Sequence, residues 1–363
     1  MAFTMTMYPA LDGDCIVLSW GESSSLHHII VDLGRGASYR AARDELMALG
    51  NVELFVMSHI DADHIAGAIP MVRERAAAFR PKRVWYNARP QLVSARDRRP
   101  ILEPLGARQG EKLARGIVKF NWPWNAEFAS EIVSTDSPEA KAPIPIAEGL
   151  SIRVLSPNDD GLVGLLPVWD SELQKARIRT FDPDEEENPL ASKFETLGSL
   201  NVANLAGEDY DRDRTEPNGS SIAFVAEFDG KRVLLAADAQ SEVLEETLKP
   251  LAQAEGGRYR LDLLKVSHHG SKANTSKIFP GLIDCTRFAV STNGQRHDHP
   301  DPQTVARFLT SDKVRQKIFY FNYRQPHTDV WDSTRLKSIY KYDCVFPVTK
   351  ESDPSNGRLA IKV

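Results

Sequence analysis

Polar turns rich in potential metal ligands follow five separate strand-like segments of this chain, and this recurrence constrains the fold more than any other feature. The segments are short and apolar, as buried strands are. The side chains that follow them are aspartate or histidine, namely Asp32, the group from His59 to His64, Asp238, His268 with His269, and His297 with His299. One such residue after a strand is usually a cap or a turn residue. Five such turns together indicate an active site along one edge of a sheet.

The densest turn, His59-Ile60-Asp61-Ala62-Asp63-His64, places four metal-capable side chains within six residues. Imidazole and carboxylate are protein ligands of zinc, manganese and iron. A site that leaves one coordination position open can turn water into a nucleophile near neutral pH. The turn therefore indicates metal-assisted hydrolysis, although a hexapeptide alone has many chance matches.

Composition and cysteine content describe an ordinary globular protein. The chain has 363 residues, of which 42% are hydrophobic and 26% charged, which is enough for a large core. We find no apolar run near the roughly 18 residues of a membrane span and no secretory signal pattern at the start. The three cysteines follow no metal-ligand spacing. We therefore expect reduced thiols, a cytoplasmic location and no membrane insertion.

The charge distribution leaves two interpretations open. A net charge of −5 gives no overall attraction to nucleic acid. Between Arg73 and Arg115, however, twelve Lys and Arg residues stand against four Asp and Glu residues. This local excess could hold a polyanion, or it could be the solvated face of a helix.

The chain reads as one domain, residues 1–363, in which strands and helices are mixed. The expected strands are 3–8, 14–20, 28–32, 52–58, 150–155, 221–228, 232–236, 261–266, 287–291 and 317–322, and the expected helices are 38–49, 65–79, 241–254 and 302–309. Two stretches lack this periodicity. Residues 85–148 are rich in proline and arginine, and residues 158–217 are polar and acidic, so we expect surface insertions, the second one flexible. An α/β fold with sheets packed face to face and helices outside fits this pattern.

Seven motifs and a late His-Pro pair carry a resemblance to a known family. They are Gly13–Leu18, Val31–Gly34, Ser58–Gly67, Val154–Pro157, Asn218–Ile222, Leu234–Ala239, Leu264–Lys272 and His299-Pro300. In these motifs the chain resembles the metallo-β-lactamase-fold hydrolases, of the branch that contains the soluble domain of the ComEC-type competence proteins and the phosphorylcholine esterases. The motifs cover most of residues 5–310 outside the two insertions. The resemblance implies a four-layer αββα sandwich with a metal centre at one edge.

The resemblance also implies two divalent ions, zinc or manganese. The implied ligands are His59 and Asp61 for the first ion, Asp63, His64 and His269 for the second, and Asp238 as a bridge between them. Asp61 stands where the family usually has histidine, and its harder oxygen ligand favours manganese modestly without excluding zinc. Asp32 would anchor the metal loop through hydrogen bonds without touching metal.

One family ligand is missing from this chain. The family usually supplies another histidine after the strand 150–155, where this sequence reads Ser156-Pro157-Asn158. Three alternatives remain open. The first ion is held weakly with extra water, an insertion supplies another ligand residue, or the site works with a single ion. We favour two ions, of which the first is the weaker.

Two adjacent histidines can both bind metal, and the sequence alone does not decide between them. The register of the motif assigns the metal to His269, which precedes glycine, and leaves His268 facing the substrate as a phosphate contact or proton donor. His299 is expected to face the substrate, with a structural turn as the alternative. Lys272 and Arg296 could neutralise a phosphate or could be only surface charges.

The leading hypothesis is a metal-dependent hydrolase of phosphodiester bonds, a nuclease acting on DNA or RNA. A hydroxide formed on the metal would attack phosphorus, with Asp63 and Asp238 orienting it and His268 or His299 assisting the leaving oxygen. One rival is a small-molecule phosphodiesterase similar to the phosphorylcholine esterases. Another is a non-catalytic metal-fold subunit of a larger complex. β-Lactam hydrolysis fits less well because Asp61 departs from the zinc ligands of those enzymes.

Overall fold

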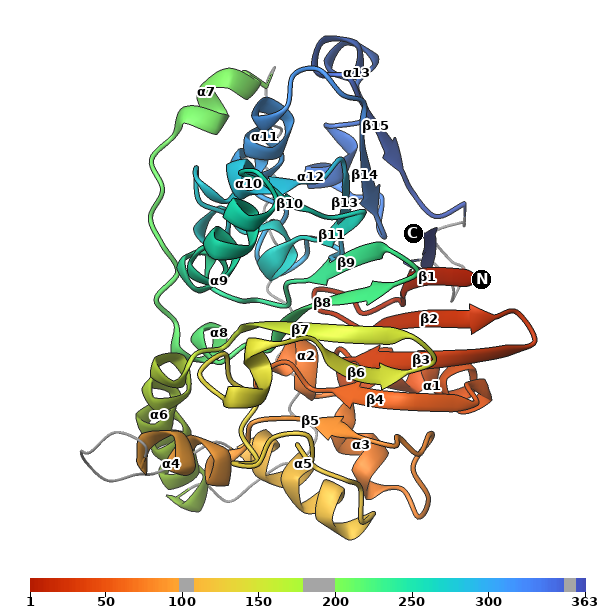
Figure 1. The fold of residues 1–363 in the computed structure, drawn as a ribbon, viewed down its shortest axis with the longest axis vertical. Coiled ribbons are helices and arrows are strands. Elements are labelled where there is room, and N and C mark those ends of the chain that lie inside the picture. The colour runs from red at the N-terminus through yellow and green to blue at the C-terminus, as the bar shows by residue number, and fades with distance from the viewer. Residues whose placement is uncertain (98–107, 179–199, 349–356) are drawn as a thin grey trace.

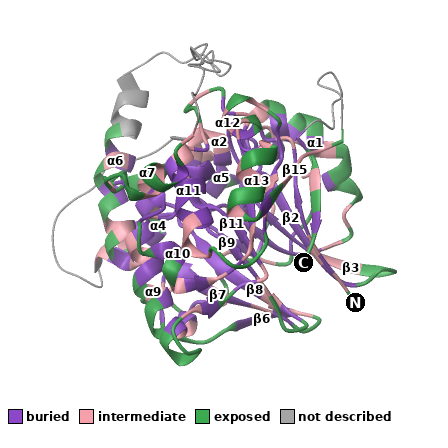
Figure 2. Cartoon of the chain, turned by 90° about the horizontal axis from the view of Figure 1, so that it is seen from above, coloured by how far each residue is buried: buried purple, intermediate pink, exposed green. Residues whose placement is uncertain are grey.

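The computed structural model describes residues 1–97, 108–178, 200–348 and 357–363. Two β-sheets lie face to face at its centre, and helices cover the outer face of each sheet (Figure 1). Buried residues concentrate in the strands and on the inward sides of the helices (Figure 2). The four-layer αββα sandwich implied by the resemblance is therefore confirmed.

The first sheet has six strands in the spatial order β16-β1-β2-β3-β4-β5. Neighbours from β16 to β3 are antiparallel, whereas β3, β4 and β5 run parallel. The strand bounds are β1 (Ala2–Met7), β2 (Ile16–Glu22), β3 (Ser25–Val31), β4 (Asn51–Val56), β5 (Val84–Trp85) and β16 (Leu359–Lys362).

The second sheet has eight strands in the order β15-β14-β13-β11-β9-β8-β7-β6. Neighbours from β15 to β9 are parallel, and neighbours from β9 to β6 are antiparallel. The bounds are β6 (Ile144–Ala147), β7 (Leu150–Ser156), β8 (Ala223–Phe228), β9 (Lys231–Leu235), β11 (Leu263–Lys265), β13 (Arg287–Val290), β14 (Lys317–Phe321) and β15 (Tyr342–Val345). A separate parallel pair joins β10 (Tyr259–Arg260) to β12 (Ile283–Asp284).

Alternation along the strands divides the apolar side chains between layers, because successive residues of a strand point to opposite faces. In β3, Ile29 and Val31 belong to the core between the sheets, whereas Ile30 joins the core under the helices. In β8, Phe224 lies between the sheets and Val225 faces the other helical layer. Both faces are buried along the apolar runs of residues 29–31 and 223–226, and this explains why these runs do not alternate with polar residues.

The longer helices form the two outer layers. The first sheet is covered by α1 (Gly36–Ala48), α3 (Ala68–Arg73), α4 (Arg89–Asp97), α5 (Arg108–Lys119) and α6 (Asp159–Ile178). The second is covered by α7 (Val202–Gly207), α9 (Ser241–Ala254), α11 (Pro302–Ser311) and α13 (Thr334–Tyr340). Shorter turns are α2 (Ala62–Ile65), α8 (Glu216–Gly219), α10 (Phe279–Leu282), α12 (Pro326–Asp329), η1 (Pro138–Lys141), η2 (Ser267–Gly270) and η3 (Lys272–Asn274). Among the described residues, none of these helices combines the length and apolarity needed to cross a membrane.

The helix expected over residues 65–79 is wrong in its extent. The chain forms the short helices α2 and α3 instead, with Gly67 between them. Gly67 donates its N–H to the carbonyl of Gly34 at 2.7 Å, and a Cβ on Gly67 would lie 2.1 Å from the Leu33 oxygen. Because the Gly67 N–H bonds to Gly34 and not to the carbonyl four residues earlier in the chain, the helical hydrogen-bond ladder is interrupted between α2 and α3.

The expectation of a flexible surface excursion is wrong for the first part of residues 158–217. Helix α6 begins at Asp159 and packs into the core under the first helical layer through Leu162, Leu165, Leu166 and Trp169. This spacing places the four side chains on one face of a helix. The centres of the two expected insertions, residues 98–107 and 179–199, lie outside the described residues.

Candidate metal centre

The polar turns predicted from the sequence meet at one edge of the two sheets. The carboxyl ends of parallel strands lie at the same edge, and β3 is parallel to β4 in the first sheet as β9 is to β11 in the second. The residues that follow these strands are Asp32 after β3, His59 to His64 after β4, Asp238 after β9, and His268 and His269 after β11. The face-to-face packing of the sheets therefore brings together residues more than 200 positions apart, such as His64 and His269.

Asp238 is buried at the centre of the cluster, and each of its oxygens faces a different group of side chains. Its Oδ2 lies 3.8 Å from Nε2 of His59, and the same nitrogen lies 3.7 Å from Oδ2 of Asp61. Asp61 is 42% exposed, so this first group opens toward solvent.

The second group surrounds the other oxygen of Asp238. Its Oδ1 lies 3.4 Å from Nε2 of His64 and 3.7 Å from Nε2 of His269. Asp63 Oδ2 lies 3.4 Å from Nε2 of His269 and 3.7 Å from Nε2 of His64. The predicted ligands of the second ion therefore converge within the distances of a single coordination sphere.

Hydrogen bonds fix which nitrogen of each histidine faces the cluster. Asp32 Oδ2 accepts a bond of 2.8 Å from His64 Nδ1 and one of 2.6 Å from the Ser58 hydroxyl. Because the Ser58 hydroxyl gives its only hydrogen to Asp32, it accepts from His59 Nδ1 at 2.9 Å. His269 Nδ1 donates to the carbonyl of Ser291 at 2.7 Å. All three Nε2 atoms therefore carry the lone pair that a metal needs.

These residues fit divalent ions. Among the described residues, His59 Nε2 and Asp238 Oδ1 are buried without a hydrogen-bond partner. The Nε2 atoms of His64 and His269 lie 3.2 Å apart, so either a proton or a metal ion must separate their two lone pairs. Ligands at zinc–nitrogen distances of 2.0–2.1 Å in a tetrahedron are about 3.4 Å apart, close to the separations found here.

The charges in the cluster stabilise one another. Burial alone would raise the pKa of Asp63, but His64 and His269 hold that pKa well below its usual range. Burial opposes the charged form of His64 as well, and Asp238, Asp63 and Asp32 raise its pKa well above the usual value. In the ion-free protein a proton therefore occupies part of the space that a divalent cation would take.

Gly13 and Lys265 support the cluster, and the sequence alone predicted no role for either. A Cβ on Gly13 would lie 1.8 Å from the carbonyl oxygen of Asp63, so only glycine allows this contact. The fully buried ammonium of Lys265 bonds to the buried carboxylate of Asp14, whose other oxygen lies 3.7 Å from His269 Nδ1. A lysine inside an otherwise apolar strand was the signal that could have revealed this pair.

The remaining predicted residues lie at different depths. His299 is mostly buried, and its ring centroid lies 5.4 Å from that of His268. Burial is the main cause that holds the pKa of His299 well below its usual value, and the charge of His268 is the next. Lys272 is exposed, and its backbone N–H donates to Asp301 at 2.8 Å. Arg296 is partly buried in the loop before His297. The structure thus brings His299 to the rim of the cluster and places the exposed Lys272 beside Asp301.

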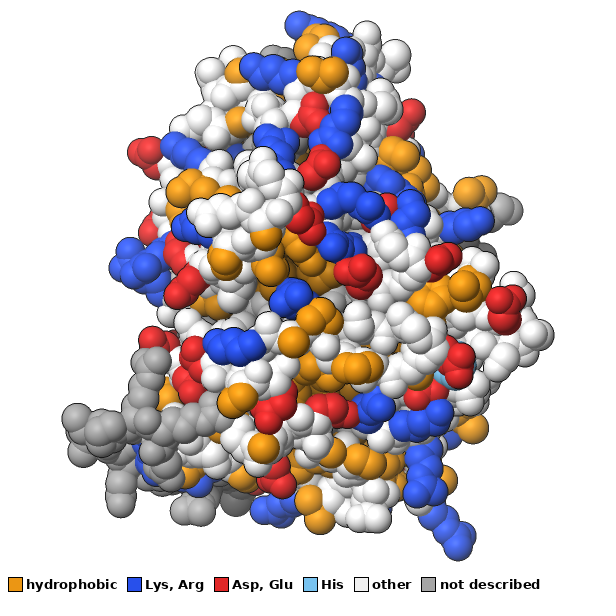
Figure 3. Space-filling model, viewed as in Figure 1, with side chains coloured by type: hydrophobic (Ala, Val, Ile, Leu, Met, Phe, Trp, Pro, Cys, Tyr) orange, Lys and Arg blue, Asp and Glu red, His pale blue; other side chains and the backbone are white. Residues whose placement is uncertain are grey.

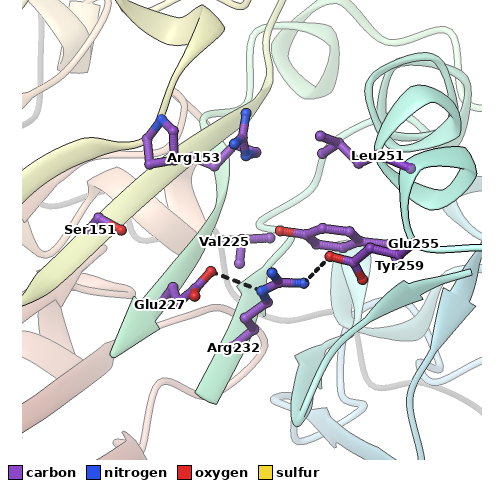
Figure 4. Close-up of a pocket in the computed structure, with 10 residues that line it drawn as sticks. Ser151, Arg153, Val225, Glu227, Arg232, Leu251, Glu255 and Tyr259 are labelled. Atoms are coloured by element: carbon purple, nitrogen blue, oxygen red, sulfur yellow. Dashed lines mark hydrogen bonds and ion pairs between the residues drawn. The ribbon is translucent and has the colours of Figure 1, made fainter. Parts of the chain in front are cut away.

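A separate pocket of about 120 Å³ lies at the opposite end of β7, β8 and β9 (Figure 4). Arg232 crosses it, bonded to Glu227 and Glu255 at 2.8 and 2.5 Å, with its guanidinium over the ring of Tyr259. Arg153 lines the pocket as well, and none of the predicted metal ligands does, so this pocket is separate from the candidate metal centre.

Comparison with known proteins gives distant likenesses. No protein-family model matches the chain, and no curated protein matches it. Among solved structures, it is similar to the metallo-beta-lactamase fold protein YhfI from Bacillus subtilis, with 9% identity over 100% of both chains and a TM-score of 0.39. Zn²⁺-bound PqqB from Methylobacterium extorquens is 11% identical, with 99% of this chain and 100% of that chain covered and a TM-score of 0.39. The E377D mutant of CmlA β-hydroxylase is 9% identical over 99% of this chain and 54% of that chain, with a TM-score of 0.36. At these similarities the fold assignment rests on the layers and strand order described above.

Proposed function

We propose that this protein is a metal-dependent hydrolase that cleaves phosphodiester bonds. The observation that carries the proposal is the position of Asp238, whose two oxygens face two separate groups of nitrogen and oxygen ligands. A bridging carboxylate between two such groups is the arrangement that holds two ions side by side. Two ions about 3.5–4 Å apart polarise a phosphoryl oxygen, lower the pKa of water and stabilise both the attacking and the leaving oxygen.

Side chains around the cluster would orient the attacking water and assist the leaving oxygen. Asp63 and Asp238 would orient the attacking water, because their oxygens line the second group. His268 or His299 would assist the leaving oxygen, since both rings lie at the rim. The pKa of His299 lies well below its usual value, so its ring is neutral near pH 7 and would assist the leaving oxygen through a hydrogen bond from its remaining N–H.

Nucleic acid is the substrate class that the resemblance implies, but the basic excess from Arg73 to Arg115 gives it less support than expected. Within that stretch, Lys82, Arg83 and Arg89 are bonded to carboxylates, namely Glu53 at 2.7 Å, Glu127 at 2.8 Å and Asp170 at 3.1 Å. On the face seen in Figure 3, cations and carboxylates are interspersed. This pairing favours a small phosphodiester as the second candidate substrate.

The test begins with metal analysis of the purified protein. Single-stranded DNA, duplex DNA, RNA and bis(p-nitrophenyl) phosphate are then offered with manganese or zinc. We expect turnover of at least one substrate and a loss of roughly 10²–10⁴-fold in Asp63→Asn. Asp229→Asn, at the exposed β8–β9 turn, should retain full activity.

Each result of this panel has a distinct meaning. Equal cleavage by wild type and Asp63→Asn would identify a contaminant and refute the proposal. Cleavage of the small ester alone would select the second substrate class. A protein that binds metal tightly but turns over no substrate, or binds no metal, would leave the non-catalytic subunit as the better interpretation.

A further inference from the structure

The first group of ligands has one donor fewer than the family pattern. His59, Asp61 and Asp238 supply three ligand atoms, and Ser156 stands where the family usually has histidine. Ser156 is buried, and its hydroxyl has no hydrogen-bond partner among the described residues. A neutral hydroxyl is not among the usual zinc ligands, so Ser156 is a poor substitute for imidazole.

His268 approaches the same carboxylate oxygen as His59 does. Its Nε2 lies 3.7 Å from Asp238 Oδ2, and His59 Nε2 lies 3.8 Å from that atom. The Nε2 atoms of His64 and His269 take the corresponding positions at Asp238 Oδ1. Two imidazoles therefore face each oxygen of the bridging carboxylate.

The hydrogen bonds of His268 leave its Nε2 free to bind a metal. Asn274 Nδ2 donates to Asp213 Oδ2 at 2.8 Å and to the carbonyl of Asp238 at 3.1 Å, which fixes the orientation of the amide. Asn274 Oδ1 must then accept from His268 Nδ1, 2.8 Å away. This matches His59, His64 and His269, whose Nδ1 atoms also donate to a fixed acceptor.

An unusual backbone conformation directs the two adjacent histidines to the two oxygens. His268 has φ 45° and ψ 53°, and His269 has φ 52° and ψ 19°, so both lie in the left-handed region. For residues other than glycine this conformation costs free energy and is concentrated at functional sites. The His268 N–H donates to the carbonyl of Ala237 at 2.9 Å, which ties the turn to the loop that carries Asp238.

We propose that His268 is the ligand that replaces the missing histidine and completes the first metal site. This inference rests on the metal centre of the proposed function, and it removes His268 from the leaving-group role and leaves that role to His299. Asp213, from the stretch expected to be a surface insertion, acts as a positioning residue. It accepts from Asn274 Nδ2 at 2.8 Å and from Asn218 Nδ2 at 2.6 Å, and so fixes the Asn274 amide whose oxygen faces His268 Nδ1. A residue from the expected insertion therefore helps to orient a metal ligand.

Zinc binding tests this inference directly and needs no substrate. The variant His268→Asn is chosen because asparagine tolerates the left-handed conformation and its side chain is too short to reach the ion. After removal of metal, zinc is added back and measured by mass spectrometry and by competition with a chromophoric chelator. We expect two ions in the wild type, and in His268→Asn one ion of unchanged affinity and one weakened by more than about 100-fold. Asp213→Asn should weaken the same ion by about 10–100-fold.

Controls and X-ray absorption separate the possible outcomes. His297→Asn, in the exposed loop before His299, should bind two ions with wild-type affinity. Zinc X-ray absorption should count about two imidazoles per ion in the wild type, against about 1.5 if His268 is not a ligand. Two ions with unchanged affinity in His268→Asn, even with activity lost, would overturn the inference and return His268 to a substrate-facing role. Absence of zinc from the wild type would overturn the metal centre itself.

Discussion

Replacement of Asp32 by asparagine should weaken metal binding without changing the shape of the site. Asp32 is fully buried, and its Oδ1 accepts the Ser58 N–H at 2.7 Å. Its Oδ2 accepts from the Ser58 hydroxyl at 2.6 Å and from His64 Nδ1 at 2.8 Å. Three donors therefore converge on a carboxylate that has only acceptors to offer.

Asparagine keeps one acceptor and introduces a donor. If its oxygen stays on the Ser58 N–H, its amino group faces His64 Nδ1, which must then lose its proton to accept. The proton moves to Nε2, where it blocks the metal. If the amide turns over, its amino group meets the Ser58 N–H, and an unsatisfied buried donor costs about 1–3 kcal/mol.

The expected loss in zinc affinity at the second site is about 10–100-fold, equivalent to about 1.4–2.8 kcal/mol. Competition with a chromophoric chelator measures it, and urea unfolding in excess chelator measures the accompanying loss of stability. The matched control is Asp170→Asn, which alters a buried carboxylate bonded to Arg89 outside the cluster. Wild-type zinc affinity in Asp32→Asn would refute the tautomer argument.

Three further changes test other parts of the structure. Trp169→Ala should lower the free energy of unfolding, measured with urea, by about 3–5 kcal/mol, because the Trp169 ring is fully buried in the core. A loss under about 1 kcal/mol would mean that α6 is peripheral. Lys265→Met should lower the free energy of unfolding by about 3–5 kcal/mol, because it leaves the buried charge of Asp14 unpaired. The second substitution Asp14→Leu should restore most of the lost stability. Gly13→Ala should reduce zinc affinity, because its Cβ would collide with the Asp63 carbonyl; unchanged binding by calorimetry would contradict this.

The strand-end residues could be predicted from the sequence because strand geometry is local and repetitive. Once β3 and β4, or β9 and β11, are recognised as parallel neighbours, the carboxyl ends of each pair lie at one edge of their sheet. Asp32 and Asp238 were found in this way. The hydrogen bonds through Ser58 could not be predicted from the sequence, because the position of the proton on His59 depends on a partner that only the folded chain supplies.

Two errors have physical explanations. Continuous helical periodicity over 65–79 concealed the close contact between Gly67 and Leu33, which no local pattern encodes. In 158–217 the acidic composition of the later part outweighed the apolar face of α6, although the spacing from Leu162 to Trp169 was visible. Composition averaged over a long stretch therefore hides a short amphipathic element.

The pairing of β1 with β16 has a consequence for biosynthesis. Met5 pairs with Ile361, so β1 acquires that neighbour only after residues 359–362 have been synthesised. Until then β1 presents a row of free N–H and C=O groups, and an open strand edge of this kind invites pairing with other chains. Nascent or truncated chains that end before Leu359 should therefore aggregate more readily than the full chain.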